Sequence, residues 1–205
     1  MRIGFDATGV YGQLFGIQSY AKHLLLALTE IDCDHEFVVF CRCEVPPSFA
    51  ERADDRFKFV VGGYGNRKLT EQTWLPRALL SSKPLDCFHA TYGRPLGPCP
   101  PTVHTLHDLF MLHFPEKYSS AMKLYHRIAV ERGTRQASRV IAVSEATKRD
   151  AMEFLDVPGE QITVVPHGVD TEKFRPFDPA RDQPEAFRAR HGLPEHYVLH
   201  LGGFS

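Results

Sequence analysis

The chain has 205 residues, of which 43% are hydrophobic and 24% charged, the balance of an ordinary soluble globular protein. Its 24 lysines and arginines offset 25 aspartates and glutamates, so no overall field attracts nucleic acid, and we expect no nucleic-acid partner. Five cysteines without zinc-like spacing and a charged N-terminus without a signal peptide predict a cytoplasmic location. No apolar run approaches the roughly 20 residues that span a bilayer.

Short apolar segments alternate with helical patterns along most of the chain. Strands are predicted at Ile3–Asp6, Phe37–Cys41, Phe57–Val61, Cys87–Thr91, Thr102–Leu106, Val140–Ser144 and Ile162–Pro166. Helices are predicted at Ile17–Ile31, at Ser119–Ala137 with Met122, Tyr125, Ile128 and Ala129 facing inward, and at Glu145–Leu155 with Ser144 as its cap. Because parallel strands need crossover helices, the pattern predicts an α/β fold with a doubly wound, mostly parallel sheet, that is, a Rossmann-like domain.

The loop after the first strand carries several glycines. In such sheets ligands gather beyond the carboxyl ends of the strands. Gly12 and Gly16 would let the backbone approach a ligand closely, and the following helix offers free N–H groups to a phosphate. The spacing does not match the dinucleotide fingerprint G-x-G-x-x-G, and glycines that serve only as loop joints remain the alternative.

His107 and Asp108 end the strand Thr102–Leu106, where a histidine is well placed to meet a ligand. Asp108 either fixes the tautomer of the histidine or caps the next turn. His104, earlier in the same strand, is expected to pack or to face solvent. A purely structural role for His107 is the alternative.

Two further segments have both a structural and a functional interpretation. Ser144 and Glu145 open a helix at another strand end, so Ser144 is first of all a helix cap. The stretch from Lys117 to Arg139 carries the further basic residues Lys123, Arg127, Arg132, Arg135 and Arg139. Such runs are usually solvated helix faces, and the alternative is a contact with a phosphate-bearing or membrane-bound acceptor.

The C-terminal part differs in composition. Residues 174–194 are rich in proline, aspartate and arginine, with one short helix predicted at Pro184–His191 and stopped by Gly192. An apolar strand is predicted from Tyr197, running into a turn at Gly202 and Gly203. We therefore predict a Rossmann-like domain over 1–175, a linker over 176–195, and the start of a truncated second domain over 196–205.

The segments VIAVSEATKRD (140–150) and ITVVPHGVDTEKFRP (162–176), together with the glycine loop and His107–Asp108, resemble a known family. They are similar to the N-terminal half of a family 4 retaining glycosyltransferase of the two-domain GT-B fold. The chain departs from that pattern in having Phe15–Gly16 where the family often has a glycine pair. The distal Glu-x7-Glu motif belongs to the second domain.

The resemblance implies a hexosyltransferase that moves a sugar from a nucleotide-sugar to a hydroxyl acceptor, a glycan or a lipid-linked glycan. The donor is held mainly by the second domain and the acceptor by this one, so the isolated chain is expected to be inactive. His107 is then the catalytic residue that positions and stabilises, and Gly12, Gly16, Asp108, Ser144 and Glu145 bind donor or acceptor. The family needs no metal and no cofactor, and a peripheral contact with the inner face of the membrane fits a lipid-linked acceptor.

Rival interpretations remain. One is a stand-alone Rossmann module that binds a nucleotide or NAD. Another is half of a GT-B-fold sugar-nucleotide epimerase or phosphorylase, and a third is a non-catalytic interaction domain. The chain contains no nucleophile elbow, no Walker A loop, no zinc spacing and no Asp-x-Asp pair, so covalent hydrolases, P-loop enzymes and metal-dependent sugar transferases of the other main architecture receive no support.

Overall fold

All seven predicted strands form and join in one parallel sheet. The computed structural model describes residues 1–11, 16–178 and 181–199. The chain divides into two compact units, Met1–His167 and Gly168–Ser205, and the sheet belongs to the first. Its strands are β1 (Arg2–Ala7), β2 (Glu36–Arg42), β3 (Phe57–Gly62), β4 (Cys87–Ala90), β5 (Thr102–Leu106), β6 (Arg139–Ala142) and β7 (Ile162–Val164).

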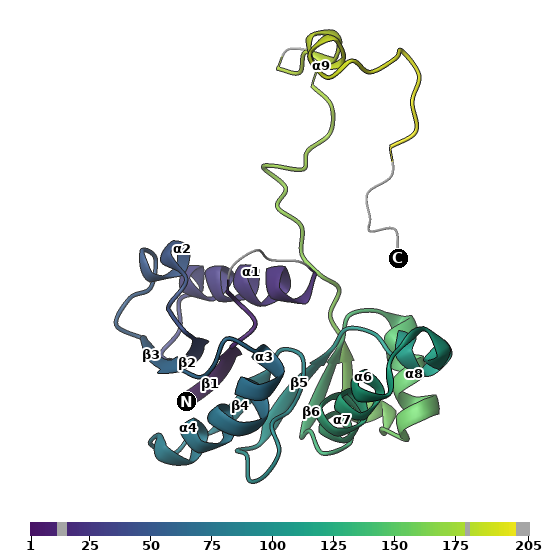
Figure 1. Cartoon of the computed structure of the whole chain (residues 1–205). Helices are drawn as coiled ribbons and strands as arrows, with labels where there is room; N and C mark the ends of the chain where they lie inside the picture. The colour runs from purple at the N-terminus through teal and green to yellow at the C-terminus, as the bar shows by residue number, and fades with distance from the viewer. Residues whose placement is uncertain (12–15, 179–180, 200–205) are drawn as a thin grey trace. The chain divides into compact units, whose positions relative to one another are not determined.

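The strand order is β3-β2-β1-β4-β5-β6-β7, so the chain begins in the middle of the sheet (Figure 1). β1 pairs with β2 on one side and with β4 on the other, with Ile3 opposite both Phe37 and Cys87. The order reverses between β1 and β4, and doubly wound sheets hold their ligands in the crevice beyond such a reversal. The predicted α/β, doubly wound, Rossmann-like fold is confirmed.

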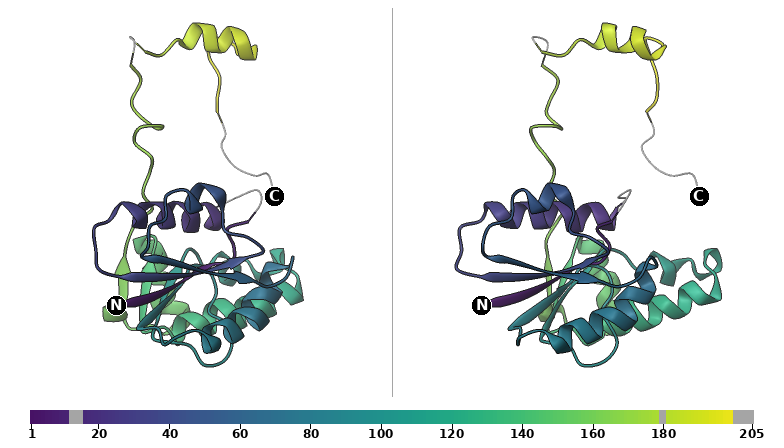
Figure 2. Two further views of the ribbon diagram at one scale, coloured as in Figure 1. Left: turned by 90° about the vertical axis from the view of Figure 1, so that its left-hand side faces the viewer. Right: turned by 60° about the vertical axis from the view of Figure 1, so that its left-hand side comes forward.

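Helices cover both faces of the sheet, as Figures 1 and 2 show. They are α1 (Ile17–Glu30), α2 (Pro47–Ala50), α3 (Arg67–Leu69), η1 (Thr70–Trp74), α4 (Leu75–Ser81), α5 (Phe110–His113), η2 (Pro115–Lys117), α6 (Ser120–Tyr125), η3 (His126–Glu131), α7 (Arg132–Arg135), α8 (Glu145–Leu155), η4 (Gly159–Gln161) and, in the second unit, α9 (Pro184–His191). The segments η1 and η3 are π-helical, and η2 and η4 are 3-10 helices.

Strand β2 contributes side chains to the hydrophobic cores on both faces of the sheet. One core lies beneath α1 and α2 and contains Leu25 of α1. Into this core β2 contributes Phe37, Val39 and Cys41. The residues between them, Val38 and Phe40, pack with Leu75 and Leu79 of α4 on the other face. Successive side chains of a strand point to opposite faces, so a continuous apolar run marks a strand buried on both sides.

The helix predicted at Ser119–Ala137 is interrupted by a π-helical segment. Within this segment, η3, the buried residues are His126, Ala129 and Val130. Met122, Tyr125 and Ile128, expected to face inward, are only half-buried. The predicted inward face is confirmed for Ala129, and Met122 and Tyr125 also point into the protein, since Met122 lines the pocket described below and Tyr125 bonds to the buried Glu71.

Three strands end earlier than predicted. β4 stops at Ala90, β6 at Ala142 and β7 at Val164, one or two residues short of the predicted ends. Pro166 has no N–H to continue the ladder, and Ser144 turns its side chain toward the helix that it caps. The residues that follow these three strand ends therefore lie outside the sheet, beyond its carboxyl edge.

The second unit contains α9, at the predicted residues Pro184–His191, which ends where Gly192 adopts the left-handed conformation with φ of 61°. Within 168–178 and 181–199 no residue is buried. The predicted strand does not form over Tyr197–Leu199, where Val198 is 98% exposed, because no described segment pairs with it. The rest of that predicted strand lies outside the described residues, and the division at 175 and 195 stays a prediction.

In the part of the chain that the structure describes, every helix is too short or too polar to span a bilayer.

Candidate functional site

His107 stands at the carboxyl end of β5, where neighbouring segments hold its ring. Its Nε2 donates a hydrogen bond to the carbonyl oxygen of Thr91 over 2.9 Å. The ring of Tyr20, on α1, meets it edge-on with centroids 4.9 Å apart, and the ring of His167 lies 5.4 Å away. Segments that follow β4, β5 and β7 thus meet α1 at this histidine.

The surroundings of His107 keep its imidazole neutral. Burial lowers the pKa of His107, and nearby His167 lowers it further, against the opposing effects of the Thr91 carbonyl and Asp108. Because the carbonyl can only accept, the proton of the neutral ring sits on Nε2. Nδ1 then carries a lone pair, to which none of the described residues donates. The ring can therefore accept a hydrogen bond from a hydroxyl group.

Tyr20 is fixed in turn by a chain of polar contacts. Its hydroxyl lies 3.1 Å from Oγ1 of Thr105, which lies 2.8 Å from Nε2 of His89. Burial lowers the pKa of His89 to about 4, so its ring is neutral at physiological pH. The contacts that support Tyr20, and through it His107, are therefore uncharged.

The other histidine of β5, His104, packs inside the protein. It is fully buried, its Nε2 donates to the carbonyl of Tyr92 over 2.7 Å, and its Nδ1 lies 3.0 Å from the hydroxyl of Thr134. With both ring nitrogens bonded to protein, it has no lone pair or N–H for a ligand. Of the two expected alternatives, packing is the one that the structure shows.

Asp108 and Ser144 both cap helical turns. Oδ1 of Asp108 accepts from the backbone N–H of Phe110, and Oγ of Ser144 accepts from that of Thr147. The hydroxyl of Thr147 in turn donates to the carbonyl of His107 over 3.2 Å. Ser144 is thereby linked to His107 through one residue, and Asp108 adjoins it along the chain.

The remaining predicted binding residues are less closely placed. Glu145 is exposed in the first turn of α8. Gly16 caps α1 with φ of 46°, a conformation that favours glycine, and a Cβ there would meet nothing within 4 Å. Neither residue is among the described residues that line the pocket below, and Gly12 lies outside the described part of the chain.

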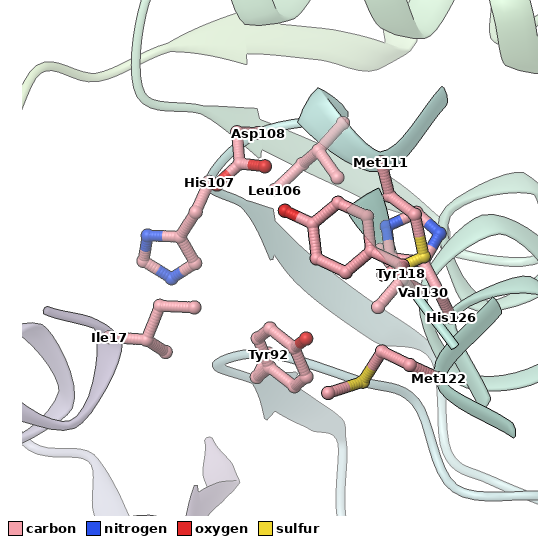
Figure 3. Close-up of a pocket in the computed structure, with 10 residues that line it drawn as sticks. All are labelled: Ile17, Tyr92, Leu106, His107, Asp108, Met111, Tyr118, Met122, His126 and Val130. Carbon is pink, nitrogen blue, oxygen red and sulfur yellow. The ribbon is translucent and has the colours of Figure 1, made fainter. Parts of the chain in front are cut away.

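A pocket of about 160 Å³ opens beside His107 (Figure 3). An engineered cavity of about 150 Å³ in another protein holds benzene, so this one has room for a single six-membered ring. Figure 3 shows the Asp108 carboxylate and the hydroxyls of Tyr92 and Tyr118 around the same space. The described lining residues are Ile17, Tyr92, Leu106, His107, Asp108, Met111, Tyr118, Met122, His126 and Val130. Apolar and aromatic walls with a few polar groups are typical of small-molecule sites.

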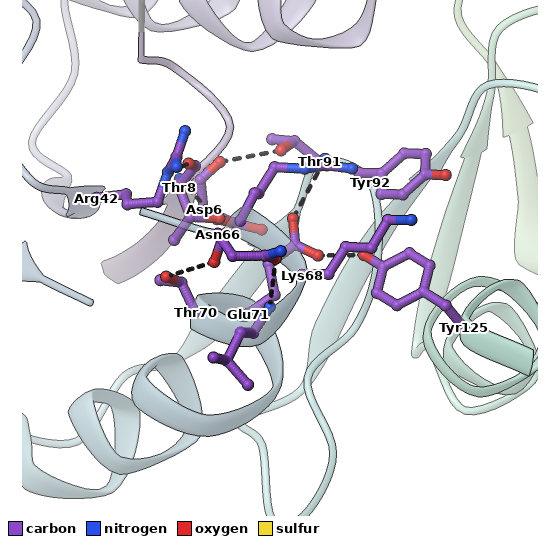
Figure 4. Close-up of polar contacts among 12 residues, drawn as sticks. Asp6, Thr8, Arg42, Asn66, Lys68, Thr70, Glu71, Thr91, Tyr92 and Tyr125 are labelled. Atoms are coloured by element: carbon purple, nitrogen blue, oxygen red, sulfur yellow. Dashed lines mark hydrogen bonds and ion pairs between the residues drawn. The ribbon is translucent and has the colours of Figure 1, made fainter. Parts of the chain in front are cut away.

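A second polar cluster occupies the reversal point between β1 and β4 (Figure 4). Asp6, only 1% exposed, accepts hydrogen bonds at Oδ1 from the backbone N–H and the hydroxyl of Thr8, at 2.9 and 2.7 Å. Its carbonyl accepts from the hydroxyl of Thr91 over 3.0 Å. Burial raises the pKa of Asp6, against its bonds to Thr8. Thr91 therefore connects this cluster to His107.

Several residues of the site have only a weak sequence signal or none. Tyr20 looks like one more apolar residue on a helix face, and His167 like part of a turn. Tyr92 directly follows a predicted strand, a position that could have drawn attention to it. Glu71 lies in a segment with no predicted element, and nothing in the local pattern indicates that it is buried.

In the described residues no group of three or more His, Cys, Asp or Glu side chains is placed to hold a metal ion.

Comparison with known proteins addresses the identity of the chain. Among curated proteins, none matches the sequence. A solved structure, a glycosyltransferase from Rickettsia africae ESF-5, is similar with 14% identity and a TM-score of 0.43, over 95% of this chain and 50% of that one. This chain thus spans half the length of that structure. The model of Glycosyltransferase Family 4 matches residues 16–173, well over half of the sequence. On that match, the chain belongs to glycosyltransferase family 4.

Proposed function

We propose that this chain is the acceptor-side half of a retaining glycosyltransferase that moves a hexosyl group from a nucleotide-sugar to a hydroxyl acceptor. The observation that carries the proposal is the neutral His107 at the edge of a ring-sized pocket, on the carboxyl side of a doubly wound sheet. Membership of the family supplies the reaction class.

The pocket is suited to one ring of the acceptor. Tyr92 and Tyr118 offer aromatic faces to the C–H groups of a sugar, and the Asp108 carboxylate can accept hydrogen bonds from hydroxyls. The lone pair on Nδ1 of His107 can accept a hydrogen bond from a hydroxyl of the bound ring. In this proposal the acceptor is a glycan or a lipid-linked glycan whose reactive end enters the pocket.

His107 orients groups and stabilises charge but forms no covalent bond. The acceptor hydroxyl attacks the anomeric carbon on the face from which the diphosphate departs, and a leaving phosphate oxygen takes its proton. The donor is held mainly by a second domain, and closure of the cleft excludes water. The proposal involves no metal ion and no cofactor.

The proposed setting is the cytoplasm, with a peripheral contact to the membrane. Support comes from the basic side chains of Lys123, Arg127, Arg132, Arg135 and Arg139, all of which are exposed. Sedimentation with vesicles of phosphatidylglycerol tests this part. Binding that disappears at high salt is expected, and no binding at low salt contradicts it.

Calorimetric titration of the 205-residue chain with UDP, GDP, ADP and NAD is the first test of the function. We expect no measurable binding, since the donor site lies mainly in a second domain. A longer protein with both domains is then assayed for hydrolysis of nucleotide-sugars and for transfer. Micromolar binding to the 205-residue chain would instead establish a complete nucleotide site and a stand-alone Rossmann module.

A further inference from the structure

Glu71 is a buried carboxylate that the reaction above does not use. Its side chain is 1% exposed, on the π-helical segment η1, and a carboxylate buried this deeply is costly unless its charge is compensated. Two groups compensate it. The hydroxyl of Tyr125, at the end of α6, donates to Oε2, and Nη1 of Arg67 on α3 lies 3.2 Å from Oε1. Figure 4 shows the Tyr125 hydroxyl directed at this carboxylate.

Both partners of Glu71 also touch Tyr92. The guanidinium of Arg67 lies 4.4 Å from the centroid of the Tyr92 ring, within the range of a cation–π contact. The ring of Tyr125 is nearly parallel to that of Tyr92, with centroids 6.2 Å apart and an interplanar angle of 16°. The carboxylate therefore supports the Tyr92 ring through both Arg67 and Tyr125.

Tyr92 in turn belongs to the pocket. Its ring lines the cavity beside His107, and it follows Thr91, whose carbonyl accepts the hydrogen bond from His107 Nε2. A displacement of Tyr92 would thus change both the wall of the pocket and the segment that orients His107.

We propose that Glu71 is a positioning residue for this pocket: by holding Arg67 and Tyr125 it fixes the ring of Tyr92 beside His107. The inference rests on the proposed function only in one respect, namely that the pocket binds the sugar acceptor. The contacts themselves do not depend on that assignment.

The charge of Glu71 depends on groups from several elements. Burial raises the pKa of Glu71 to about 7, against the lowering effect of Arg67, while Asp6 at the end of β1 raises it further. The hydrogen bond from Tyr125 and the charge of Arg42 lower it. A further positive charge, Lys68, lies near Tyr125, with its Nζ 5.0 Å from the centroid of the Tyr125 ring. Near neutral pH the carboxyl therefore gains or loses the charge that attracts Arg67.

Nuclear magnetic resonance of the chain with ¹³C-labelled tyrosine tests the proposal, with Tyr92 assigned by Tyr92→Phe. In the wild-type chain the Tyr92 ring signals should shift with pH with a midpoint of about 7. Glu71→Gln should abolish that transition. The matched control is Glu30→Gln, which removes a carboxylate that is 71% exposed and should leave the transition unchanged. A Tyr92 signal without a transition near neutral pH, or one that persists in Glu71→Gln, overturns the proposal.

Tyr125→Phe provides a second test that does not depend on the folding of Glu71→Gln. It removes the hydrogen bond that favours the ionised carboxyl, so the midpoint seen at Tyr92 should move to higher pH. An unchanged midpoint overturns the proposal as well, because the ring would then be responding to another group.

These measurements are independent of catalysis. If Tyr92 titrates as described but the two-domain protein transfers no sugar, the positioning role stands and the proposed function fails. If the two-domain protein is an active transferase and the Tyr92 signals do not shift with pH, the proposed function stands and the positioning role of Glu71 fails.

Discussion

Single residues at this site differ in what they contribute to chemistry and to folding. His107 is held by one hydrogen bond and by aromatic contacts, and its neutral ring keeps one nitrogen free for a substrate. Glu71 is held by an ion pair and a hydrogen bond, and it faces only protein groups. Substitution of the first should therefore affect turnover, and substitution of the second should affect stability in a way that depends on pH.

His107→Ala in a two-domain form of the enzyme should lower turnover by about 100-fold or more while the fold is kept. The reason is the loss of a positioned hydrogen-bond acceptor at the pocket. The measurement is the initial rate of sugar transfer, with circular dichroism to check folding. His113→Ala is the control, because that side chain is 40% exposed and pairs with Asp150 outside the pocket. Wild-type turnover in His107→Ala would remove His107 from the site.

Glu71→Gln should flatten the dependence of stability on pH. Burial raises the pKa of Glu71 from 4.5 to about 7, so the folded state binds the proton more tightly than the unfolded state. The protonated carboxyl therefore adds to the free energy of unfolding at pH values below the pKa of the unfolded state, 4.5. This contribution is lost as the pH rises through the pKa of the folded state, about 7. Between about pH 4.5 and pH 8 the wild type should lose up to about 3 kcal/mol relative to the variant.

Urea denaturation at several pH values measures this difference, with Glu30→Gln as the exposed control. If wild type and Glu71→Gln keep a constant difference in the free energy of unfolding across that range, the pKa of Glu71 is the same in the folded and the unfolded state and is not raised by burial.

At the scale of elements, the site depends on how helix α8 starts. Ser144 caps it, and Thr147, in its first turn, bonds to the carbonyl of His107. One short segment therefore both closes the helix end and fixes the backbone of the histidine. The π-helical segments η1 and η3 have a comparable effect, because η1 carries Glu71 and η3 buries His126 against the pocket.

Ser144→Ala should destabilise the protein by about 1 kcal/mol, the usual cost of a lost helix cap. It should also loosen the Thr147 contact that holds the His107 backbone. Thermal unfolding measures the first effect. Ser138→Ala, at an exposed position outside any helix start, should change stability by less than about 0.5 kcal/mol. Equal stabilities of the two variants would show that the cap contributes nothing here.

At the scale of the whole molecule, the buried residues among those that the structure describes all precede the second unit. The last large core side chain is Ile162, and no described residue after His167 is buried. Several apolar side chains of 168–199 are exposed instead, among them Phe174 and Phe177 at 64% and 63%.

A chain that ends after Arg175 should therefore fold with nearly unchanged stability, within about 1 kcal/mol of the 205-residue chain. Thermal unfolding of both chains measures it. A chain that ends after Leu155 is the counterpart, since it loses β7 and the buried Val157 and Ile162, and it should not fold. A large loss of stability on truncation at Arg175 would show that the second unit supports the core.

The sequence by itself determined the elements and their class. All seven strands, α1, α8 with its Ser144 cap, and α9 follow from apolar periodicity and local capping, which act within a few residues. The position of His107 and Asp108 just beyond the end of β5 follows from the strand pattern too, and their contact with a ligand there stays a prediction. Family membership followed from the motifs around Ser144 and Pro166–Asp170 and agrees with the family match.

Only the tertiary structure decided which residues complete the site. Glu71 and Tyr125 are 54 positions apart in the sequence and meet across one hydrogen bond, and Tyr20 reaches Thr105 from 85 positions away. The π-helical segment η3 buries His126 and Val130, which the regular helical pattern did not mark as facing inward. Burial then set the protonation of Glu71 and His107. Contacts and desolvation of this kind arise only when distant segments pack together, so no local pattern encodes them.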